Sequence, residues 1–258
     1  MKALLLFVCS SLTACYSTMS PEAPLAIEIQ QPKGASTTVF EEGTWSYFLQ
    51  HLPTVAGDIV DYTGTPIRNQ AKHVAILNYD VGKRDLQQCA DALIRLRAEY
   101  LFAQKRYNEI AFRFTSGEWY RYKDYVAGVR PAIIARQIYA GEVKPVAVSH
   151  ATLRSYLDII YAFAGTQSLY RDLLPATDFR VGTIIITPGS PGHCCMVIDE
   201  TTNAAGQKRF KLVESYMPAQ SIYVLKNPED GSAWYPLQKG TITTASYQFT
   251  KYALKKFE

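Results

Sequence analysis

The strongest secondary-structure pattern in the chain lies between Leu86 and about Lys105. Apolar or small residues occupy positions 86, 89, 90, 93, 96, 100 and 101, and this spacing places side chains on one face of an α-helix. Asp85 stands directly before the pattern and suits the N-cap position. The sequence therefore predicts a helix from Leu86 to about Lys105, with Cys89 in its first turn.

The second half of the chain has the pattern of β-strands. Strands are predicted at 183–187, 193–199, 208–214 and 221–225, separated by turns that contain Gly, Pro and polar residues. A helix followed by an antiparallel meander is typical of an α+β fold. Shorter elements are predicted before and between these, with helices at 44–52 and 152–163 and a strand at 73–79.

Composition excludes several classes of protein. The chain has 258 residues, of which 48% are hydrophobic and 19% are charged, so it can build a buried core and is not a disordered chain. The formal net charge is only +4, and the charges are scattered along the sequence. This pattern does not favour a nucleic-acid partner.

The N-terminal sequence predicts that the protein is located in the cell envelope. Lys2 precedes a short apolar run, Ala3–Leu12, and the segment Leu12-Thr13-Ala14-Cys15 follows at its end. Together these features resemble a bacterial lipoprotein signal. The resemblance implies cleavage before Cys15, attachment of lipid to Cys15, and anchoring in a membrane on the periplasmic side or at the cell surface. The alternative is an ordinary secretory peptide.

From this signal we predict the organisation of the chain. Residues 1–14 are expected to be the signal peptide, residues 15–40 the lipidated N-terminus and a tether, and residues 41–258 a single α+β domain. The tether interpretation follows from the prolines, serines and threonines between residues 16 and 40.

The cysteine count argues against a complete set of disulfides. The five cysteines are Cys9, Cys15, Cys89, Cys194 and Cys195. Because the first is removed with the signal and the second carries lipid, three remain in an oxidising compartment. An odd number cannot pair completely, so at least one thiol stays free or protected.

Cys89 is the candidate nucleophile. The N-terminal end of a helix carries partial positive charge and unpaired N–H groups, which favour a thiolate and can stabilise an oxyanion. The alternative is a core cysteine, because position 89 also lies on the apolar face of the predicted helix.

His193 and Glu214 are the candidate partners of this thiol. If strands 193–199 and 208–214 form one hairpin in which residue 199 faces residue 208, then His193 lies opposite Glu214 on the same sheet face. Glu214 would then accept a hydrogen bond from the imidazole and orient it. A slip of one residue would bring Ser215 to this position, on the other face.

The order of these residues resembles that of papain-like hydrolases, especially the NlpC-type (NlpC/P60) cell-wall peptidases. The matching segments are the helix-opening Cys89, Val181-Gly182-Thr183, and Gly189-Ser190-Pro191-Gly192-His193. The resemblance implies a papain-like fold with a long central helix packed on an antiparallel sheet. It also implies a cysteine hydrolase acting on peptide or amide bonds, with cell-wall peptides as the expected substrate and no cofactor.

Four further residues are expected to bind substrate. Gln88 precedes the nucleophile, and Ser190 lies in the turn before His193. Ser215 and Tyr216 begin the loop that follows Glu214, which places them at the expected rim of a cleft.

A closer resemblance covers most of the chain. Five segments are similar to the bacterial lipoprotein family known as domain of unknown function 4846: residues 80–92, 95–101, 164–169, 189–193 and 215–220. The name of this family implies no activity.

Other chemistry remains open at this stage. His193-Cys194-Cys195 suggests a metal site, but neighbouring strand residues face opposite sides, so no metal is expected. A disulfide between Cys89 and Cys195 would silence the nucleophile. The second hypothesis is therefore a non-catalytic binding or structural lipoprotein on the same fold.

Overall fold

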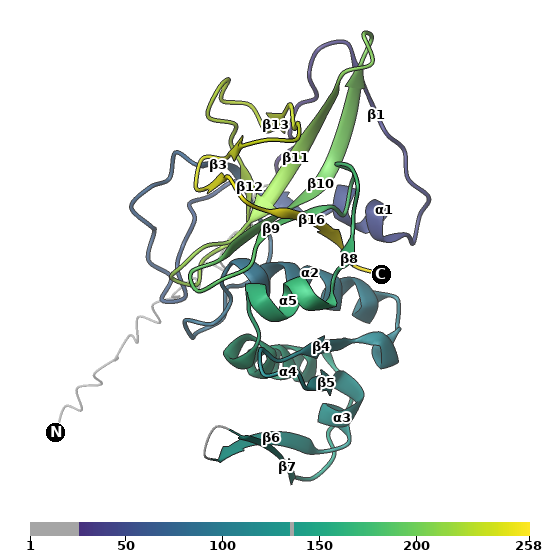
Figure 1. The fold of residues 1–258 in the computed structure, drawn as a ribbon, viewed down its shortest axis with the longest axis vertical. Coiled ribbons are helices and arrows are strands. Elements are labelled where there is room, and N and C mark those ends of the chain that lie inside the picture. The colour runs from purple at the N-terminus through teal and green to yellow at the C-terminus, as the bar shows by residue number, and fades with distance from the viewer. Residues whose placement is uncertain (1–25, 135–136) are drawn as a thin grey trace, which may run out of the picture.

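The computed structural model describes residues 26–134 and 137–258. The expected signal peptide and the lipid-bearing Cys15 lie outside these residues. Figure 1 shows a large sheet at one end of the molecule, the helices α2 (Cys89–Ala103) and α5 (Thr166–Asp172) below it, and the hairpin of β6 (Val129–Ile134) and β7 (Gln137–Glu142) at the opposite end.

Within the described residues, ten strands form one antiparallel sheet. Eight of them follow one path across it: β2 (Thr54–Val55), β3 (His73–Leu77), β12 (Tyr223–Leu225), β11 (Lys208–Glu214), β10 (His193–Asn203), β9 (Ile184–Thr187), β16 (Ala253–Lys256) and β8 (Leu174–Pro175). Off this path, β1 (Ala35–Thr37) pairs with β10 and β13 (Trp234–Tyr235) pairs with β11. The fold is thus α+β with a large antiparallel sheet.

The remaining elements are short. They are α1 (Trp45–Gln50), a 3₁₀ turn at Tyr107–Glu109, β4 (Ala111–Arg113), β5 (Trp119–Arg121), α3 (Tyr122–Val126), α4 (His150–Phe163), β14 (Ile242–Thr243) and β15 (Gln248–Phe249). The pairs β4–β5, β6–β7 and β14–β15 each form a separate two-stranded sheet.

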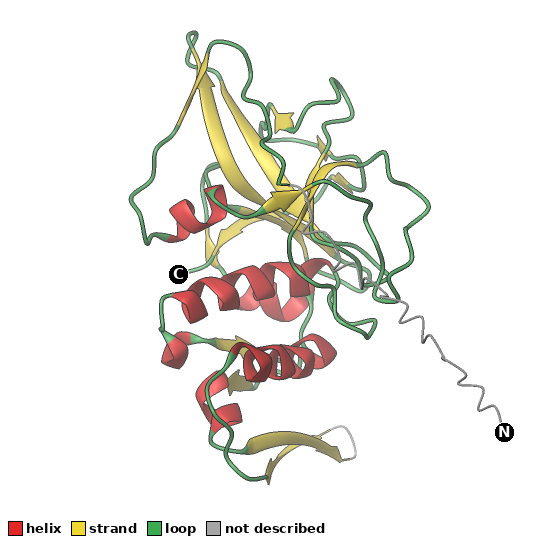
Figure 2. Cartoon of the chain, turned by 180° about the vertical axis from the view of Figure 1, so that it is seen from behind, coloured by secondary structure: helices red, strands yellow, loops and turns green. Residues whose placement is uncertain are grey.

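Helix α2 is buried on nearly all sides because the sheet covers one face while α4 and α5 lie against the other (Figure 2). Its buried charged residues, which include Asp91, Arg95 and Glu99, therefore need partners within the protein. The sheet itself separates two apolar cores. Strand alternation directs Cys194 and Met196 toward the core that contains α2, and Cys195 and Val197 toward the other core.

The predicted helices and strands occur close to their expected positions. Helix α2 begins at Cys89 rather than Leu86. Gln88 is its N-cap, and residues 84–88 form tight turns instead of helix. Helix α4 begins at His150, two residues before the prediction, because the side chain of Ser149 caps it. Strand β10 continues four residues beyond Asp199, the end expected for it.

The predicted register of the β10–β11 hairpin is wrong. Val197 faces Leu212, and a bulge separates this pair from the pair of Asp199 and Lys211. The turn is tighter than the sequence suggested, because β10 runs on to Asn203 and residues 204–207 connect it to β11. On the other edges of these two strands, His193 pairs with Thr187 of β9 and Glu214 pairs with Tyr223 of β12.

The part of the expected tether that the structure describes lies against the sheet. The main-chain N–H of Ile27 donates to the carbonyl of Thr54 at 2.9 Å, and β1 adds to one edge of β10. Some residues before residue 41 are therefore in contact with the sheet.

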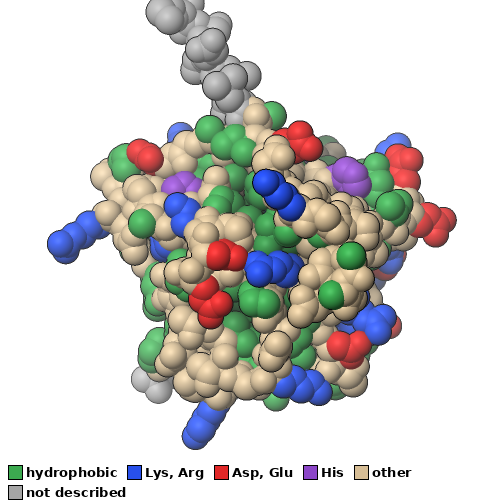
Figure 3. Space-filling view, turned by 90° about the horizontal axis from the view of Figure 1, so that it is seen from above, with side chains coloured by type: hydrophobic (Ala, Val, Ile, Leu, Met, Phe, Trp, Pro, Cys, Tyr) green, Lys and Arg blue, Asp and Glu red, His purple; other side chains and the backbone are tan. Residues whose placement is uncertain are grey.

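The surface seen in Figure 3 carries Lys and Arg side chains interspersed with Asp and Glu. The described residues include no helix of the length and apolarity that crossing a membrane requires.

Candidate functional site

Cys89 is the first residue of α2, and only 7% of its surface is exposed. Its Sγ lies 4.0 Å from the carbonyl oxygen of Gly192. The main-chain N–H of Ala90 is hydrogen-bonded to the sulfur. The thiol therefore sits among the free donors of the helix N-terminus, at the turn that leads into β10.

The loop before Cys89 is held by a buried guanidinium. Arg95, one turn and a half further along α2, is 1% exposed. Its Nη2 lies 2.9 Å from Oδ2 of Asp80, and its Nη1 lies 2.8 Å from Oε1 of Gln87. These charge-assisted bonds fix both ends of the segment that delivers Cys89 to the helix.

His193 is the first residue of β10 and is 2% exposed. Its Nε2 lies 2.8 Å from Oε2 of Glu214, and its side chain is also hydrogen-bonded to Cys89. Since Nε2 is occupied by the carboxylate, Nδ1 is the nitrogen available to the thiol. The rings of Tyr216 and Tyr247 pack on the imidazole, with centroids 5.0 and 4.7 Å away.

The electrostatics of the site favour an ion pair between sulfur and imidazole. Hydrogen bonds from the side chains of Cys194 and His193 lower the pKa of Cys89 to about 5, although burial opposes this shift. Burial also acts to lower the pKa of His193, but hydrogen bonds with Cys89 and Glu214, and the charges of both, raise it to about 9. Between these values the groups are a thiolate and an imidazolium.

Glu214 is fully buried and its two carboxylate oxygens have separate partners. While Oε2 binds His193, Oε1 accepts from the hydroxyl of Tyr223 at 2.5 Å. The ammonium of Lys72 lies 4.8 Å from the centre of the Tyr223 ring and lends positive charge to this region. Burial and the nearby charge of Glu214 raise the pKa of Tyr223, so its hydroxyl remains a donor.

A cleft of about 220 Å³ adjoins Cys89. Of the residues expected to bind substrate, Gln88 and Ser190 line it. Ser215 does not, because it is buried and its Oγ donates to the carbonyl of Gln220 at 2.9 Å. Tyr216 does not line the cleft either, and it packs on His193 instead.

The alternative of a disulfide between Cys89 and Cys195 does not occur in the structure. Cys89, Cys194 and Cys195 are all free thiols, and Cys195 points into the core on the side of the sheet away from α2. It is Cys194 that faces the helix and contacts the Cys89 sulfur. His193, the first residue of β10, reaches Cys89 from the end of the strand.

Two further residues of the site lack a local signal in the sequence. Tyr223 is brought to Glu214 by the pairing of β11 with β12, whose register the pattern did not define. Asp91 is 5% exposed, accepts from the Gln88 N–H at 3.1 Å through Oδ2, and has no partner for Oδ1. Burial raises the pKa of this carboxyl well above its ordinary value.

Residues 26–134 and 137–258 contain no cluster of three or more His, Cys, Asp or Glu side chains that could hold a metal ion. The donors gathered at Cys89 are instead arranged for proton transfer and for stabilising negative charge on sulfur or oxygen.

Comparison with curated proteins and with solved structures finds no match to this chain. A family model does match, and it spans residues 25–256. This range includes Cys89, His193 and Glu214. The chain therefore belongs to the family described as Domain of unknown function (4846).

Proposed function

We propose that this protein is a cysteine hydrolase that cleaves peptide or amide bonds, with Cys89 as nucleophile, His193 as general acid and base, and Glu214 as the group that orients His193. The observation that carries the proposal is the hydrogen-bonded sequence Cys89–His193–Glu214 at the N-terminus of a buried helix. Each member has the partner that nucleophilic catalysis requires.

In the first step the Cys89 thiolate attacks the carbonyl carbon of the amide. A C–S bond forms and the electron pair of the C=O bond moves to oxygen, where the N–H groups of the first helical turn can stabilise it. As the tetrahedral intermediate collapses, the C–N bond breaks and the imidazolium of His193 gives its proton to the leaving amine.

In the second step water attacks the resulting thioester. Neutral His193 takes a proton from the water, the C–S bond breaks, and the acid is released while Cys89 returns to the thiolate. Glu214 keeps the imidazole in one orientation throughout, because its own position is fixed by Tyr223.

The wider proposal is a lipid-anchored enzyme with a papain-like fold, acting on peptides of the cell wall. Its support is the chain order of helix-opening cysteine, strand-opening histidine and a carboxylate on the next strand, together with the lipoprotein-like N-terminus. This substrate assignment is by analogy with other proteins of similar site order.

One observation favours a second function, that of a binding protein without catalysis. Cys89 and His193 are 7% and 2% exposed, so little of either residue meets solvent. A protein that only binds ligand in the adjoining cleft would place no demand on access to the sulfur.

The rate of Cys89 alkylation by iodoacetamide, measured against pH, separates the two functions. Labelling is located by mass spectrometry with Cys194 left in place, because its side chain contributes to the low pKa of Cys89. Wild-type protein is compared with His193→Ala, and with His51→Ala as a control that removes a histidine far from the site. In parallel, peptidoglycan sacculi are incubated with wild type and with Cys89→Ala, and released peptides are measured.

The proposal expects labelling that is already fast at pH 6 and that His193→Ala slows, together with peptide release that Cys89→Ala abolishes. Labelling that rises only near pH 9 in both proteins would overturn the enzyme proposal. Fast labelling without release of any peptide from sacculi would overturn the assignment of substrate but not that of the nucleophile.

A further inference from the structure

Two free thiols meet at the N-terminus of α2. Cys89 is the first residue of this helix and Cys194 is the second residue of β10, and their side chains are hydrogen-bonded to each other. The hydrolase proposed above forms and breaks bonds at Cys89 alone, so the second thiol has no reactive part in it.

The start of β10 holds the two thiols together. The carbonyl oxygen of Gly192, just before the strand, lies 4.0 Å from Sγ of Cys89, and the next residue, His193, is hydrogen-bonded to the same sulfur. Strand alternation then directs Cys194 into the core that contains α2, while Cys195 faces the other core. Three successive residues of one chain segment therefore surround the Cys89 sulfur, and the third of them is a thiol.

The two thiols differ in their access to solvent. Cys89 lines the cleft of about 220 Å³ and is 7% exposed. Cys194 is fully buried and does not line the cleft. A small reagent that enters the cleft therefore meets Cys89 first and reaches Cys194 only through it.

They differ in the same sense in reactivity. The thiolate is the form of cysteine that attacks an electrophile. Hydrogen bonds from Cys194 and His193 lower the pKa of Cys89 to about 5, whereas burial, the hydrogen bond with Cys89 and its charge raise the pKa of Cys194 well above its ordinary value. At neutral pH an accessible thiolate thus lies against an inaccessible, protonated thiol.

We infer that Cys89 and Cys194 form a peroxide-reducing dithiol, in which a hydroperoxide oxidises Cys89 and Cys194 then closes a disulfide with it. The inference does not depend on the hydrolase proposal, because neither step involves an amide substrate.

In the first step the Cys89 thiolate attacks the terminal oxygen of the hydroperoxide. An S–O bond forms and the O–O bond breaks, and the two electrons from sulfur leave with the departing oxygen. The imidazolium of His193 gives its proton to that oxygen, which is released as an alcohol, or as water when the oxidant is hydrogen peroxide. Cys89 is left as a sulfenic acid.

In the second step the sulfur of Cys194 attacks the sulfur of the sulfenic acid. An S–S bond forms, the S–O bond breaks, and the hydroxyl group leaves with the proton of Cys194 as water. Holding the two sulfurs together makes this step effectively unimolecular, which offsets the protonation of Cys194. In sum, one hydroperoxide and two thiols give an alcohol, a water and a disulfide.

Peptide mapping after oxidation tests this inference. The full chain is reduced, freed of reductant, exposed to a small excess of hydrogen peroxide at pH 7, and alkylated with iodoacetamide. Trypsin, which cleaves after Lys and Arg, places Cys89 in residues 85–95 and both Cys194 and Cys195 in residues 181–208. The wild type should give these two peptides joined by a bond that dithiothreitol breaks.

Two variants identify the second cysteine. Cys195→Ala is the matched control, because Cys195 is equally buried but lies on the other face of the strand, and it should give the joined peptides in unchanged yield. Cys194→Ala should reduce their yield at least tenfold, and Cys89 should instead accumulate as a sulfenic acid that dimedone traps.

The Cys195→Ala protein decides the matter even if Cys194→Ala does not fold, because Cys194 is then the only cysteine in residues 181–208. Thermal unfolding midpoints establish which variants are folded.

The inference would be overturned if the joined peptides were missing from wild type or from Cys195→Ala. Their persistence in folded Cys194→Ala would assign the bond to Cys195 and would overturn it as well. Because the disulfide is detected by mass, a protein that forms it but releases no peptide from sacculi would support this inference while contradicting the substrate proposed for the hydrolase.

Discussion

The imidazole of His193 and the carboxylate of Glu214 form a buried pair, with Nε2 and Oε2 2.8 Å apart and no more than 3% of either side chain exposed. A buried charge that loses its partner destabilises a fold more than the pair itself stabilises it. Single substitutions that disturb this pair should therefore change the stability of the fold, and such changes can be used to test the proposals.

The first prediction concerns pH. The Cys89 thiol loses its proton near pH 5, and the His193 imidazolium loses its proton near pH 9. Hydrolysis should therefore rise as pH increases through about 5, stay level, and fall as pH increases through about 9, because the thiolate attacks and the imidazolium donates. A pH–rate profile checks this window. A profile with its acid limb near pH 9 would contradict it.

The second prediction separates the two adjacent cysteines. Cys194→Ala removes the hydrogen bond that most lowers the pKa of Cys89, so this pKa should rise and alkylation at pH 4–5 should slow, by roughly tenfold for each unit of pKa. Cys195→Ala is the matched control, because Cys195 is equally buried but faces the other core. Equal effects of both substitutions would show that core packing, not the hydrogen bond, is responsible.

The third prediction concerns the support of Glu214. Tyr223→Phe removes the hydroxyl that donates to Oε1 and leaves a buried carboxylate oxygen without that donor. The free energy of unfolding should fall by about 1–3 kcal/mol. Urea denaturation at pH 7 measures the change. Tyr252→Phe, which alters a half-buried tyrosine elsewhere, should cost much less, and a similar loss in both would contradict the prediction.

The fourth prediction uses the raised pKa of Asp91. As pH rises above 3.8, the ordinary pKa of an aspartate, this carboxyl ionises in the unfolded chain but holds its proton in the folded chain. The stability of the wild type therefore falls until the folded pKa is passed. Asn cannot ionise, and Asp91→Asn should therefore gain stability relative to wild type between pH 4.5 and pH 7.5. Denaturation at both values checks this, with Glu42→Gln as an exposed control. A constant difference between wild type and variant would refute it.

The fifth prediction concerns the turn that carries His193. A Cβ on Gly192 would collide with Thr166 and lie 2.7 Å from the carbonyl oxygen of Thr187, so Gly192→Ala should shift the turn and destabilise the fold by about 1–3 kcal/mol. Gly165→Ala is the control, because a Cβ there meets nothing within 4 Å. Thermal unfolding distinguishes the two. An unchanged Gly192→Ala protein would mean that the turn has room to adapt.

The sequence predicted the elements of the site better than their arrangement. Local patterns place Cys89 in the first turn of a helix and His193 at the start of a strand, and both positions agree with the structure to within three residues. The contact between His193 and Glu214 also occurs, but through a different register from the predicted one. The length of a turn and the presence of a bulge decide register, and neither has a strong signature in one sequence.

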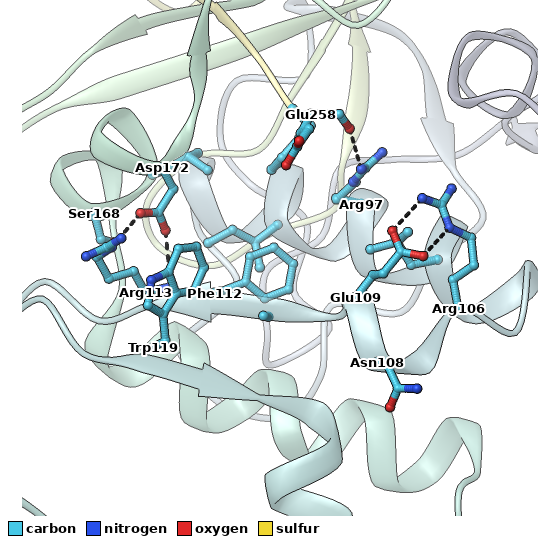
Figure 4. Close-up of a pocket in the computed structure, with 15 residues that line it drawn as sticks. Arg97, Arg106, Asn108, Glu109, Phe112, Arg113, Trp119, Ser168, Asp172 and Glu258 are labelled. Atoms are coloured by element: carbon cyan, nitrogen blue, oxygen red, sulfur yellow. Dashed lines mark hydrogen bonds and ion pairs between the residues drawn. The ribbon is translucent and has the colours of Figure 1, made fainter.

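Sequence patterns did not predict the contacts between residues that are far apart in the chain. Tyr223 and Cys194 join the site through the pairing of strands and the position of α2. A cavity of about 500 Å³ beside α2 (Figure 4) combines residues of α2, β4, α5 and the chain end, which are far apart in the sequence. No periodicity in any one of these segments indicates that the others will lie beside it.

The small volume of the cleft at Cys89 has a consequence for selectivity if the hydrolase proposal holds. A cleft of about 220 Å³ beside Cys89, a residue that is 7% exposed, has room for only a short piece of substrate, such as a segment of extended chain. Folded proteins hold their peptide bonds in helices, sheets and turns that are too bulky to enter. Such an enzyme would not cleave folded proteins around it, because they do not fit the cleft, and it would need neither an inhibitor nor recognition of sequence to spare them. It would act only on substrates that are already unfolded or extended.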